Sequence, residues 1–243
     1  MKSLAAVLAL ASAAPAFAAS GPHPFDVHDL VMMDRVSDPA LSPDGTSIAF
    51  GVRETDYEAN KGKNSVWTVP YAGGAPQRLT DKALNATSPR WSSDGKALYF
   101  LAPKDGTSQL WRIDAKGGTA LQATSLSLDV NNFRLSPDGK RVLLSLDVFN
   151  ECANDADAVA CTQKKLDARK ADKASGTVYD SIFVRHWDSW SDGRRSQLFV
   201  ADLGADGKPG KLELLTQGID GDVPSKPFGD DSEYAFSADG KTV

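Results

Sequence analysis

The sequence lacks the short motifs that mark most catalytic and nucleotide-binding sites. It contains no G-x-S-x-G nucleophile elbow, no glycine-rich phosphate loop and no H-E-x-x-H zinc motif. Histidine is scarce, with only His23, His28 and His186. Because acyl transfer needs a nucleophile beside a general base, we expect no catalytic triad within this chain. We also expect no cofactor and no metal.

Long hydrophobic runs are missing, apart from one at the start of the chain. Met1-Lys2-Ser3 precedes an apolar stretch from Leu4 to Phe17, which ends in Ala16-Phe17-Ala18. This pattern is typical of a secretory signal peptide. The stretch is shorter than the about 20 apolar residues that span a bilayer; a buried N-terminal helix is the alternative. We predict cleavage between Ala18 and Ala19, and a periplasmic or secreted bacterial protein.

Cysteine is limited to Cys152 and Cys161, nine positions apart. A metal site would need further Cys or His ligands nearby, and the sequence has none there. In an oxidising compartment such a pair more often forms a disulfide. We predict that bond, which should stabilise the fold by roughly 2–3 kcal/mol at most because the loop it closes is short.

Clustered positive charge is also absent. The formal net charge is −5, and it becomes −6 when Lys2 leaves with the signal peptide. Nucleic-acid binding asks for clustered Lys and Arg, so a nucleic-acid partner is not expected.

A turn motif recurs four times in the rest of the chain. It reads Leu41-Ser42-Pro43-Asp44-Gly45, Trp91-Ser92-Ser93-Asp94-Gly95, Leu135-Ser136-Pro137-Asp138-Gly139 and Phe236-Ser237-Ala238-Asp239-Gly240, with aspartates 50, 44 and 101 positions apart. Proline presets the first central position of a type I turn, and Gly takes the left-handed conformation that completes a hairpin with a bulge. We expect each motif to join two antiparallel strands.

Strand-like segments follow each turn at similar spacing. Second strands are expected at 47–52, 97–101 and 141–146, third strands at 65–69, 109–113 and 197–201, and fourth strands near 79–80, 121–124 and 214–216. Four short antiparallel strands in about 45 residues are the signature of a β-propeller blade. A β-sandwich is the alternative.

The expected fold is therefore all-β, an incomplete β-propeller of four-stranded antiparallel blades. Within a mature chain of residues 19–243, the blades are predicted at about 36–80, 87–124, 131–216 and 230–243. The last blade stops at Val243, inside its second strand. Because a ring cannot close on half a blade, we expect the chain to be a piece of a longer protein.

The third blade contains an insertion, residues 150–195, between its second and third strands. The insertion holds both cysteines, a helix-favouring stretch from Asp155 to Lys173 and an aromatic run from Tyr179 to Trp190. Insertions of this kind emerge on one rim of a propeller, where they often make functional contacts.

Arg185, His186 and Trp187 are the strongest polar and aromatic cluster in the insertion. One interpretation is that they face a cavity and contact a peptide, with the guanidinium binding a carboxylate or carbonyl. The other is that Trp187 and Trp190 only pack the insertion onto its blade.

The blades resemble those of TolB-like periplasmic propellers and of the prolyl oligopeptidase family of serine peptidases. Residues 184–193 (V-R-H-W-D-S-W-S-D-G) and 222–229 (D-V-P-S-K-P-F-G) are similar to the propeller of the bacterial dipeptidyl-peptidase 5 and acylaminoacyl-peptidase branch. The resemblance extends from about Pro24 to Val243.

Members of that branch place the propeller before an α/β-hydrolase domain that carries Ser, Asp and His. The resemblance implies that the parent protein is an exported serine exopeptidase acting on short peptides, with the propeller gating access, and that this chain alone is inactive. The alternative is a non-enzymatic TolB-like propeller that binds a partner protein. The long insertion favours the peptidase, and the oligomeric state stays open.

Overall fold

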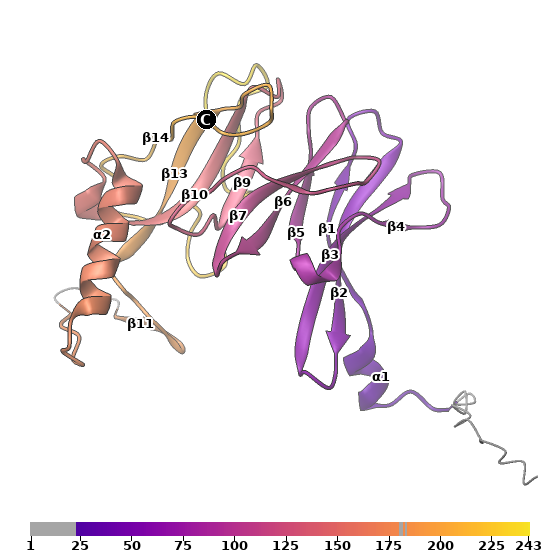
Figure 1. The fold of residues 1–243 in the computed structure, drawn as a ribbon, viewed down its shortest axis with the longest axis horizontal. Helices are drawn as coiled ribbons and strands as arrows, with labels where there is room; N and C mark the ends of the chain where they lie inside the picture. The colour runs from indigo at the N-terminus through magenta and orange to yellow at the C-terminus, as the bar shows by residue number, and fades with distance from the viewer. Residues whose placement is uncertain (1–22, 180–181, 183) are drawn as a thin grey trace, which may run out of the picture.

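Three four-stranded antiparallel sheets stand side by side in the computed structural model, which describes residues 23–179, 182 and 184–243. The predicted cleavage site at Ala18 and Ala19 lies outside the described residues. The first sheet contains β1 (Arg35–Leu41), β2 (Ser47–Asp56), β3 (Lys61–Pro70) and β4 (Gln77–Arg78). The second contains β5 (Thr87–Trp91), β6 (Ala97–Lys104), β7 (Thr107–Asp114) and β8 (Leu121–Gln122). The third contains β9 (Asn132–Leu135), β10 (Arg141–Phe149), β13 (Arg194–Asp202) and β14 (Glu213–Leu214) (Figure 1).

Two short helices flank the first sheet. Helix α1 (Val27–Met32) precedes it, and Asp26 caps the start of this helix by accepting hydrogen bonds from the backbone N–H groups of His28 and Asp29. The 3₁₀ helix η1 (Lys82–Leu84) links the first sheet to the second. In the part of the chain that the structure describes, no helix is long and apolar enough to cross a membrane.

All four S-x-D-G motifs form the same turn. In each turn the serine hydroxyl donates to the aspartate, with Oγ–Oδ1 distances of 2.6 to 2.7 Å in the pairs Ser42–Asp44, Ser92–Asp94, Ser136–Asp138 and Ser237–Asp239. The glycine that follows has φ between 68° and 71° in every case, a region where other residues are strained. In the three sheets, the motif therefore fixes where the first strand ends and the second strand begins.

The hydrophobic core lies between neighbouring sheets. Side chains of β6 alternate in direction, so Leu98 and Phe100 pack against the first sheet while Tyr99 and Leu101 pack against the third. Full burial of such a side chain stabilises a fold by about 1.5–3 kcal/mol. The middle sheet thus holds the other two together, which is the packing expected of propeller blades.

A buried glutamine–threonine pair closes the second and third sheets. Thr124 Oγ1 donates to Gln109 Oε1 at 2.8 Å and accepts from the backbone N–H of Leu110 at 2.9 Å. Gln197 and Thr216 make the same contacts in the third sheet. Because these polar groups are buried and paired, they fix the fourth strand against the third without leaving unsatisfied atoms.

Each sheet is also tied to the linker that leads onward along the chain. A side chain of the linker accepts a hydrogen bond from a backbone N–H of the third strand, at 2.6 to 3.0 Å, in the pairs Asn64–Asn85, Ser108–Asp129 and Ser196–Asp222. We call these three linker residues the linker caps. They show that each linker is part of the hydrogen bonding of the sheet before it.

The insertion in the third sheet is partly helical, as expected. It begins with η2 (Asn150–Cys152), continues as α2 (Ala158–Ala171) and includes the short hairpin of β11 (Arg185–His186) and β12 (Ser189–Trp190). Asp157 caps the start of α2 by accepting from the backbone N–H of Ala160.

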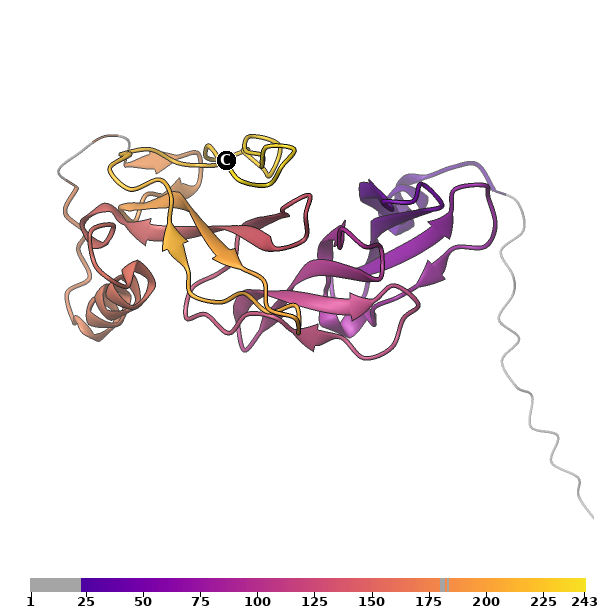
Figure 2. The ribbon, with the colours of Figure 1, turned by 90° about the horizontal axis from the view of Figure 1, so that it is seen from above.

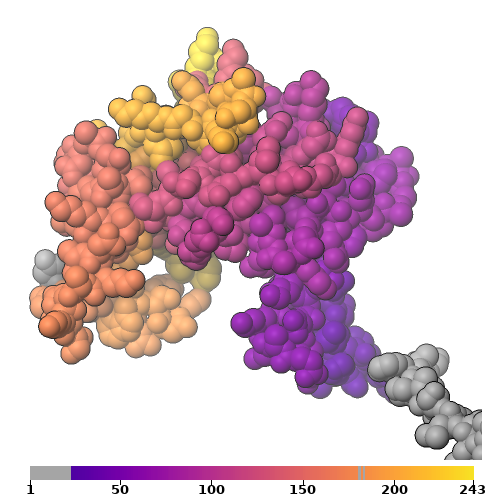
Figure 3. All heavy atoms as spheres, viewed as in Figure 1, coloured from indigo at the N-terminus to yellow at the C-terminus, as the bar shows by residue number. Residues whose placement is uncertain are grey.

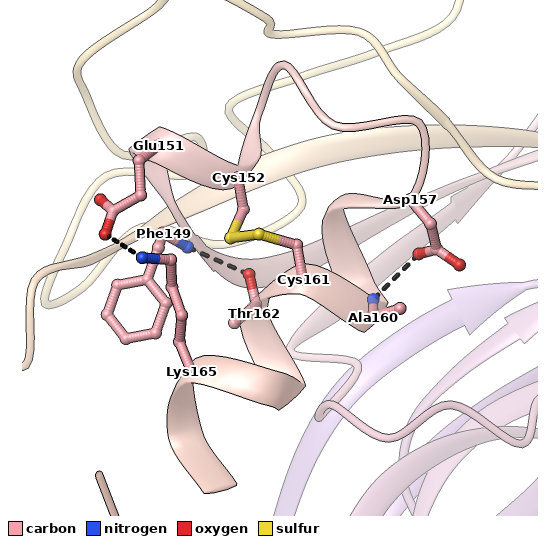
Figure 4. The surroundings of a disulfide bond; sticks show 8 residues. All are labelled: Phe149, Glu151, Cys152, Asp157, Ala160, Cys161, Thr162 and Lys165. Atoms are coloured by element: carbon pink, nitrogen blue, oxygen red, sulfur yellow. Dashed lines mark hydrogen bonds and ion pairs between the residues drawn. A yellow bond between two sulfur atoms is a disulfide. The ribbon is translucent and has the colours of Figure 1, made fainter. Parts of the chain in front are cut away.

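A disulfide between Cys152 and Cys161 joins η2 to α2, with the two Cα atoms 5.6 Å apart (Figure 4). Beside it, the hydroxyl of Thr162 accepts a hydrogen bond from the backbone N–H of Phe149, the last residue of β10. Lys165 and Glu151 form an ion pair across the same junction at 2.8 Å. The start of the insertion is therefore attached to the sheet by covalent and polar contacts together.

Residues 230–243, expected to begin a fourth blade, contain the fourth turn but no strand. The segment lies beside the third sheet (Figure 2). Tyr234 packs it onto that sheet, because its side chain is buried against Leu143 and Leu198. Burial raises the pKa of the Tyr234 phenol. The outer face of β10 is thus covered by the residues that follow the third sheet.

Candidate peptide-binding site

Arg185, His186 and Trp187 lie on the hairpin of β11 and β12. Arg185 pairs with Trp190 and His186 with Ser189, which leaves Trp187 in the two-residue turn at the tip. All three side chains are exposed; Trp187 has 69% of its surface accessible. The structure brings the three predicted residues together on one hairpin and leaves their side chains exposed.

The backbone at the tip is unfavourable for tryptophan. Trp187 has φ 48°, in the left-handed region. Two-residue hairpin turns that need positive φ usually carry Gly, Asn or Asp, and a bulky residue there is an outlier. An exposed tryptophan in a strained turn therefore adds little to the stability of the fold.

An aromatic contact joins the hairpin to a second loop. The ring of Phe228 lies 5.3 Å from that of Trp187 and 6.5 Å from that of His186, measured between centroids. On the other side of the hairpin, the Arg185 guanidinium lies 5.3 Å from the centre of the Trp190 ring. Phe228 is 73% exposed, so the rings meet at the surface.

Phe228 belongs to a second insertion in the repeat. Five positions separate the linker cap Asp129 from Arg134 in β9, whereas thirteen separate the linker cap Asp222 from Ala235, which stands at the equivalent place before its turn. The linker after the third sheet is thus eight residues longer. We call its extra segment, residues 224–231, the long linker.

An open cavity of about 680 Å³ lies between the two insertions. Its lining comes from the hairpin side, from the long linker and from the strands between them; it includes Arg185, His186, Trp190, Asp147, Arg195, Asp222, Pro224, Lys226 and Pro227. Trp187 and Phe228 do not line it but are chain neighbours of lining residues. The space-filling view shows a separate, wider gap between the region that carries the hairpin and the far end of the β2–β3 hairpin, whose residues do not line this cavity (Figure 3). A cavity of this size suits a small ligand.

Charged groups on the cavity wall are paired with one another. Lys226 Nζ lies 3.0 Å from Asp147 Oδ2 and 3.5 Å from Asp222 Oδ1, so one ammonium bridges two carboxylates. Arg195 pairs with Asp222 and with Asp220, at 3.6 and 3.1 Å. The buried Oδ1 atom of Asp147 accepts no hydrogen bond from the protein.

Asp192 lies in the same wall, next to Arg194. Burial raises the pKa of this carboxyl, but the backbone N–H and the guanidinium of Arg194 both donate to it and outweigh the burial, so its pKa lies below the usual range. The wall therefore includes a carboxylate that its neighbours hold in the ionised form.

Residues outside the cavity hold the long linker in place. Glu233 accepts hydrogen bonds from the backbone N–H and the hydroxyl of Ser225, both at 2.7 Å. Asp231, the last residue of the long linker, pairs with Arg90 of β5, and Arg134 of β9 donates to the backbone carbonyl of Asp231. Arg90 and Arg134 occupy the same position in their two strands, four residues before the turn aspartate.

The arrangement can bind and orient a ligand, but among the described residues it contains no serine hydroxyl hydrogen-bonded to a histidine. The predicted hairpin residues are near the cavity. Asp147 and the role of the long linker were missed, although one charged residue within the apolar strand V-L-L-S-L-D-V-F was a visible signal.

The match to a family model decides the family. Residues 31–181 match the TolB beta propeller domain, which is more than half of the chain. The chain belongs to the TolB β-propeller family. This propeller family accounts for the three sheets and for the packing between them.

Relatives with curated names are peptidases. The chain is 32% identical over 212 residues to dipeptidyl-peptidase 5 of Porphyromonas gingivalis, a match that covers 87% of this chain and 29% of that protein. The enzyme of the same name from Porphyromonas endodontalis is 30% identical over 220 residues, covering 88% and 29%. The chain thus spans less than a third of the length of these relatives.

Among solved structures, the fold is similar to that of the acylaminoacyl peptidase of Pyrococcus horikoshii. The TM-score is 0.55 at 18% identity, over 76% of this chain and 26% of that one. At this identity the similarity concerns the fold alone. It supports the arrangement of the three sheets as part of a propeller.

Proposed function

We propose that this propeller is the substrate-gating part of an exported serine exopeptidase that hydrolyses short peptides. The observation that carries the proposal is the 32% identity to dipeptidyl-peptidase 5 along 87% of the chain. In this proposal the catalytic serine, aspartate and histidine lie in a hydrolase domain outside the chain. This chain alone has no peptidase activity.

The cavity supports this role because it lies between two segments that the other blades lack, the 150–195 insertion and the long linker. A blade needs neither the 150–195 insertion nor the long linker to pack against its neighbours. Both segments meet at one cavity, where Arg185 and His186 contribute to the lining. Arg185, His186 and Trp187 would contact the peptide, with the guanidinium binding a carbonyl or carboxylate.

The proposal is tested by comparing the chain with the longer natural protein that contains it. The longer protein should hydrolyse dipeptidyl chromogenic substrates and lose this activity after treatment with a fluorophosphonate, which reacts with an activated serine. The chain alone should release no chromophore. A longer protein that is inactive on dipeptidyl substrates would contradict the proposal.

Variants separate substrate contact from packing. In the longer protein, Arg185→Ala and Trp187→Ala should lower turnover and leave the melting temperature nearly unchanged, because both side chains are exposed. Tyr71→Ala is a suitable control, since Tyr71 is 67% exposed in the turn after β3 and does not line the cavity. A fall in stability without a fall in turnover would return the cluster to a packing role.

Export is the second part of the proposal. It rests on the Ala16-Phe17-Ala18 pattern after an apolar run. N-terminal sequencing of protein isolated from the periplasm or the medium should begin at Ala19. Recovery of exported material that starts at Met1 would refute the cleavage.

The second candidate is a non-enzymatic propeller that binds a partner protein. It is favoured by the family match itself, because the matched family is that of the TolB beta propeller domain. The reading frame after Val243 distinguishes the two candidates: a G-x-S-x-G motif some hundreds of residues on supports the peptidase, and further blades followed by a stop support the binding protein.

A further inference from the structure

Phe228 and Trp187 form an exposed ring pair that the propeller itself does not need. Their exposed fractions are 73% and 69%, and the centroids are 5.3 Å apart. Neither ring belongs to a hydrophobic cluster between the sheets. Exposed aromatic rings that stay side by side offer apolar area to a ligand at small loss of conformational entropy.

The backbone at Trp187 strengthens this point. At φ 48° a glycine would be relaxed, whereas a tryptophan is strained. Strain of this kind persists where a side chain serves a purpose other than stability, and it clusters at ligand-binding sites. The tip of the hairpin thus carries a tryptophan where a glycine would form the turn without strain.

The charges beside the ring pair complement an acceptor group on a ligand. Arg194, Arg195 and Lys226 each lie within 4.0 Å of a carboxylate. Arg185 has no such partner among the described residues; its Nε donates to the backbone carbonyl of Trp187. Its remaining N–H groups donate to no acceptor among the described residues, and the guanidinium lies beside the rings.

We propose that Phe228, together with Trp187, selects peptides that carry a large apolar side chain. This inference rests on the proposed function, because it takes a short peptide as the ligand. The side chain packs across the two rings at the edge of the cavity, and the adjacent carbonyl or carboxylate of the peptide binds Arg185. Phe228 is thus a specificity-determining residue.

Hydrogen bonds at both ends of the long linker hold the segment that carries Phe228. Near the start of the long linker, Ser225 donates two hydrogen bonds to Glu233. At its end, Asp231 accepts a hydrogen bond from Arg90. Phe228 lies between these attachments. These attachments hold the loop on both sides of the residue whose ring meets Trp187.

Calorimetric titration of the full chain with Ala-Phe-Ala and with Ala-Gly-Ala tests the proposal. Ala-Phe-Ala should bind about tenfold or more tightly, because packing an aromatic side chain against the rings removes apolar area from water. Phe228→Ala should remove this preference, and Phe228→Leu should keep part of it. Tyr71→Ala, which changes an aromatic residue that is also exposed but does not line the cavity, should leave both affinities unchanged.

Trp187→Gly distinguishes a role of Trp187 in peptide binding from a role in stability. It should relieve the strained turn and leave the melting temperature unchanged or higher, while the preference for Ala-Phe-Ala disappears. Equal affinity for the two peptides in the unaltered chain, or an undiminished preference in Phe228→Ala, overturns the inference.

The outcome is separable from that of the proposed function. If the chain prefers Ala-Phe-Ala and the longer protein hydrolyses no dipeptidyl substrate, the peptidase proposal fails and the ring pair stands as a binding site. If the longer protein hydrolyses peptides with Gly and Phe at equal rates and the chain binds them equally, the ring-pair inference fails alone.

Discussion

Arg90 and Asp231, 141 positions apart, form an ion pair with two hydrogen bonds. Arg90 Nε lies 3.0 Å from Asp231 Oδ2, and Nη2 lies 2.9 Å from Oδ1. Only 27% and 17% of the two side chains are exposed. The pair connects the first strand of the second sheet to the long linker, so a residue outside the cavity helps to position one of its walls.

Loss of this pair should destabilise the protein. We expect Arg90→Ala to lower the free energy of unfolding by about 1.5–3 kcal/mol, because a partly buried carboxylate loses a charged donor. The free energy of unfolding of Arg90→Lys should lie between those of the unaltered protein and of Arg90→Ala, since an ammonium cannot make the same two-point contact with the carboxylate. Urea titration measures both. Lys96→Ala is the control, because the Lys96–Asp94 pair is exposed and should contribute less than about 1 kcal/mol; equal effects at the two sites would contradict the role of Arg90.

The buried pair of Gln197 and Thr216 should be sensitive to a substitution that keeps its volume. Gln197→Leu removes the acceptor for the Thr216 hydroxyl and the donor to the backbone carbonyl of Gly221. We expect a loss of about 1–3 kcal/mol in the free energy of unfolding, measured by urea titration. Gln109→Leu in the second sheet should behave in the same way. Gln77→Leu, at an exposed position in β4, should change stability by less than about 0.5 kcal/mol.

The disulfide should stabilise mainly the start of the insertion. Protein isolated without reductant should gain the mass of two hydrogens on reduction, and alkylation should label neither Cys152 nor Cys161 beforehand. The double variant Cys152→Ser/Cys161→Ser should be less stable by roughly 2–3 kcal/mol, the entropy expected for so short a loop. Thiols that react with alkylating reagent before reduction would contradict the pairing.

The turn aspartates should make stability fall in acid. Hydrogen bonds from serine hydroxyls, followed by backbone N–H groups, lower the pKa of Asp44, Asp94, Asp138 and Asp239. A carboxyl whose pKa is lower in the folded state than in the unfolded state stabilises the fold fully at pH values above its unfolded pKa of about 3.9. That stability is lost as the pH falls through the lower, folded pKa.

Melting temperatures recorded from about pH 5 to about pH 2 test this dependence. Ser136→Ala removes the hydroxyl that donates to Asp138, so the melting temperature should be lower at neutral pH but should decline less steeply in acid. Ser127→Ala, at an exposed position outside the turns, should leave the profile unchanged. An acid decline of the same steepness in Ser136→Ala would argue against the turn aspartates as its source.

The sequence predicted those parts of the fold that depend on local chemistry. Ser-x-Asp-Gly sets the turn by hydrogen bonds within a few residues, and so the antiparallel sheets followed from it. The extents were less predictable: β2 continues to Asp56, and each fourth strand is only two residues long. The contact between Gln197 and Thr216 escaped notice because it joins strands whose register depends on the whole sheet.

The site was predictable only in part. Arg185, His186 and Trp187 stood out because aromatic and basic residues are rare in such clusters, and the structure places them on an exposed hairpin. Phe228, Lys226 and Asp147 come from other segments, and their approach depends on the lengths of two insertions. No local pattern carries that information. A comparison of linker lengths between repeats would have pointed to residues 224–231.

The linker caps also couple the hydrogen exchange of each sheet to the segment that follows it. The backbone N–H groups of Asn64, Ser108 and Ser196 are bonded to Asn85, Asp129 and Asp222, which belong to the start of the following segment. Their exchange with deuterium therefore depends on whether the following segment is in place, and not only on their own strand. One amide per sheet can thus follow the order in which successive blades open.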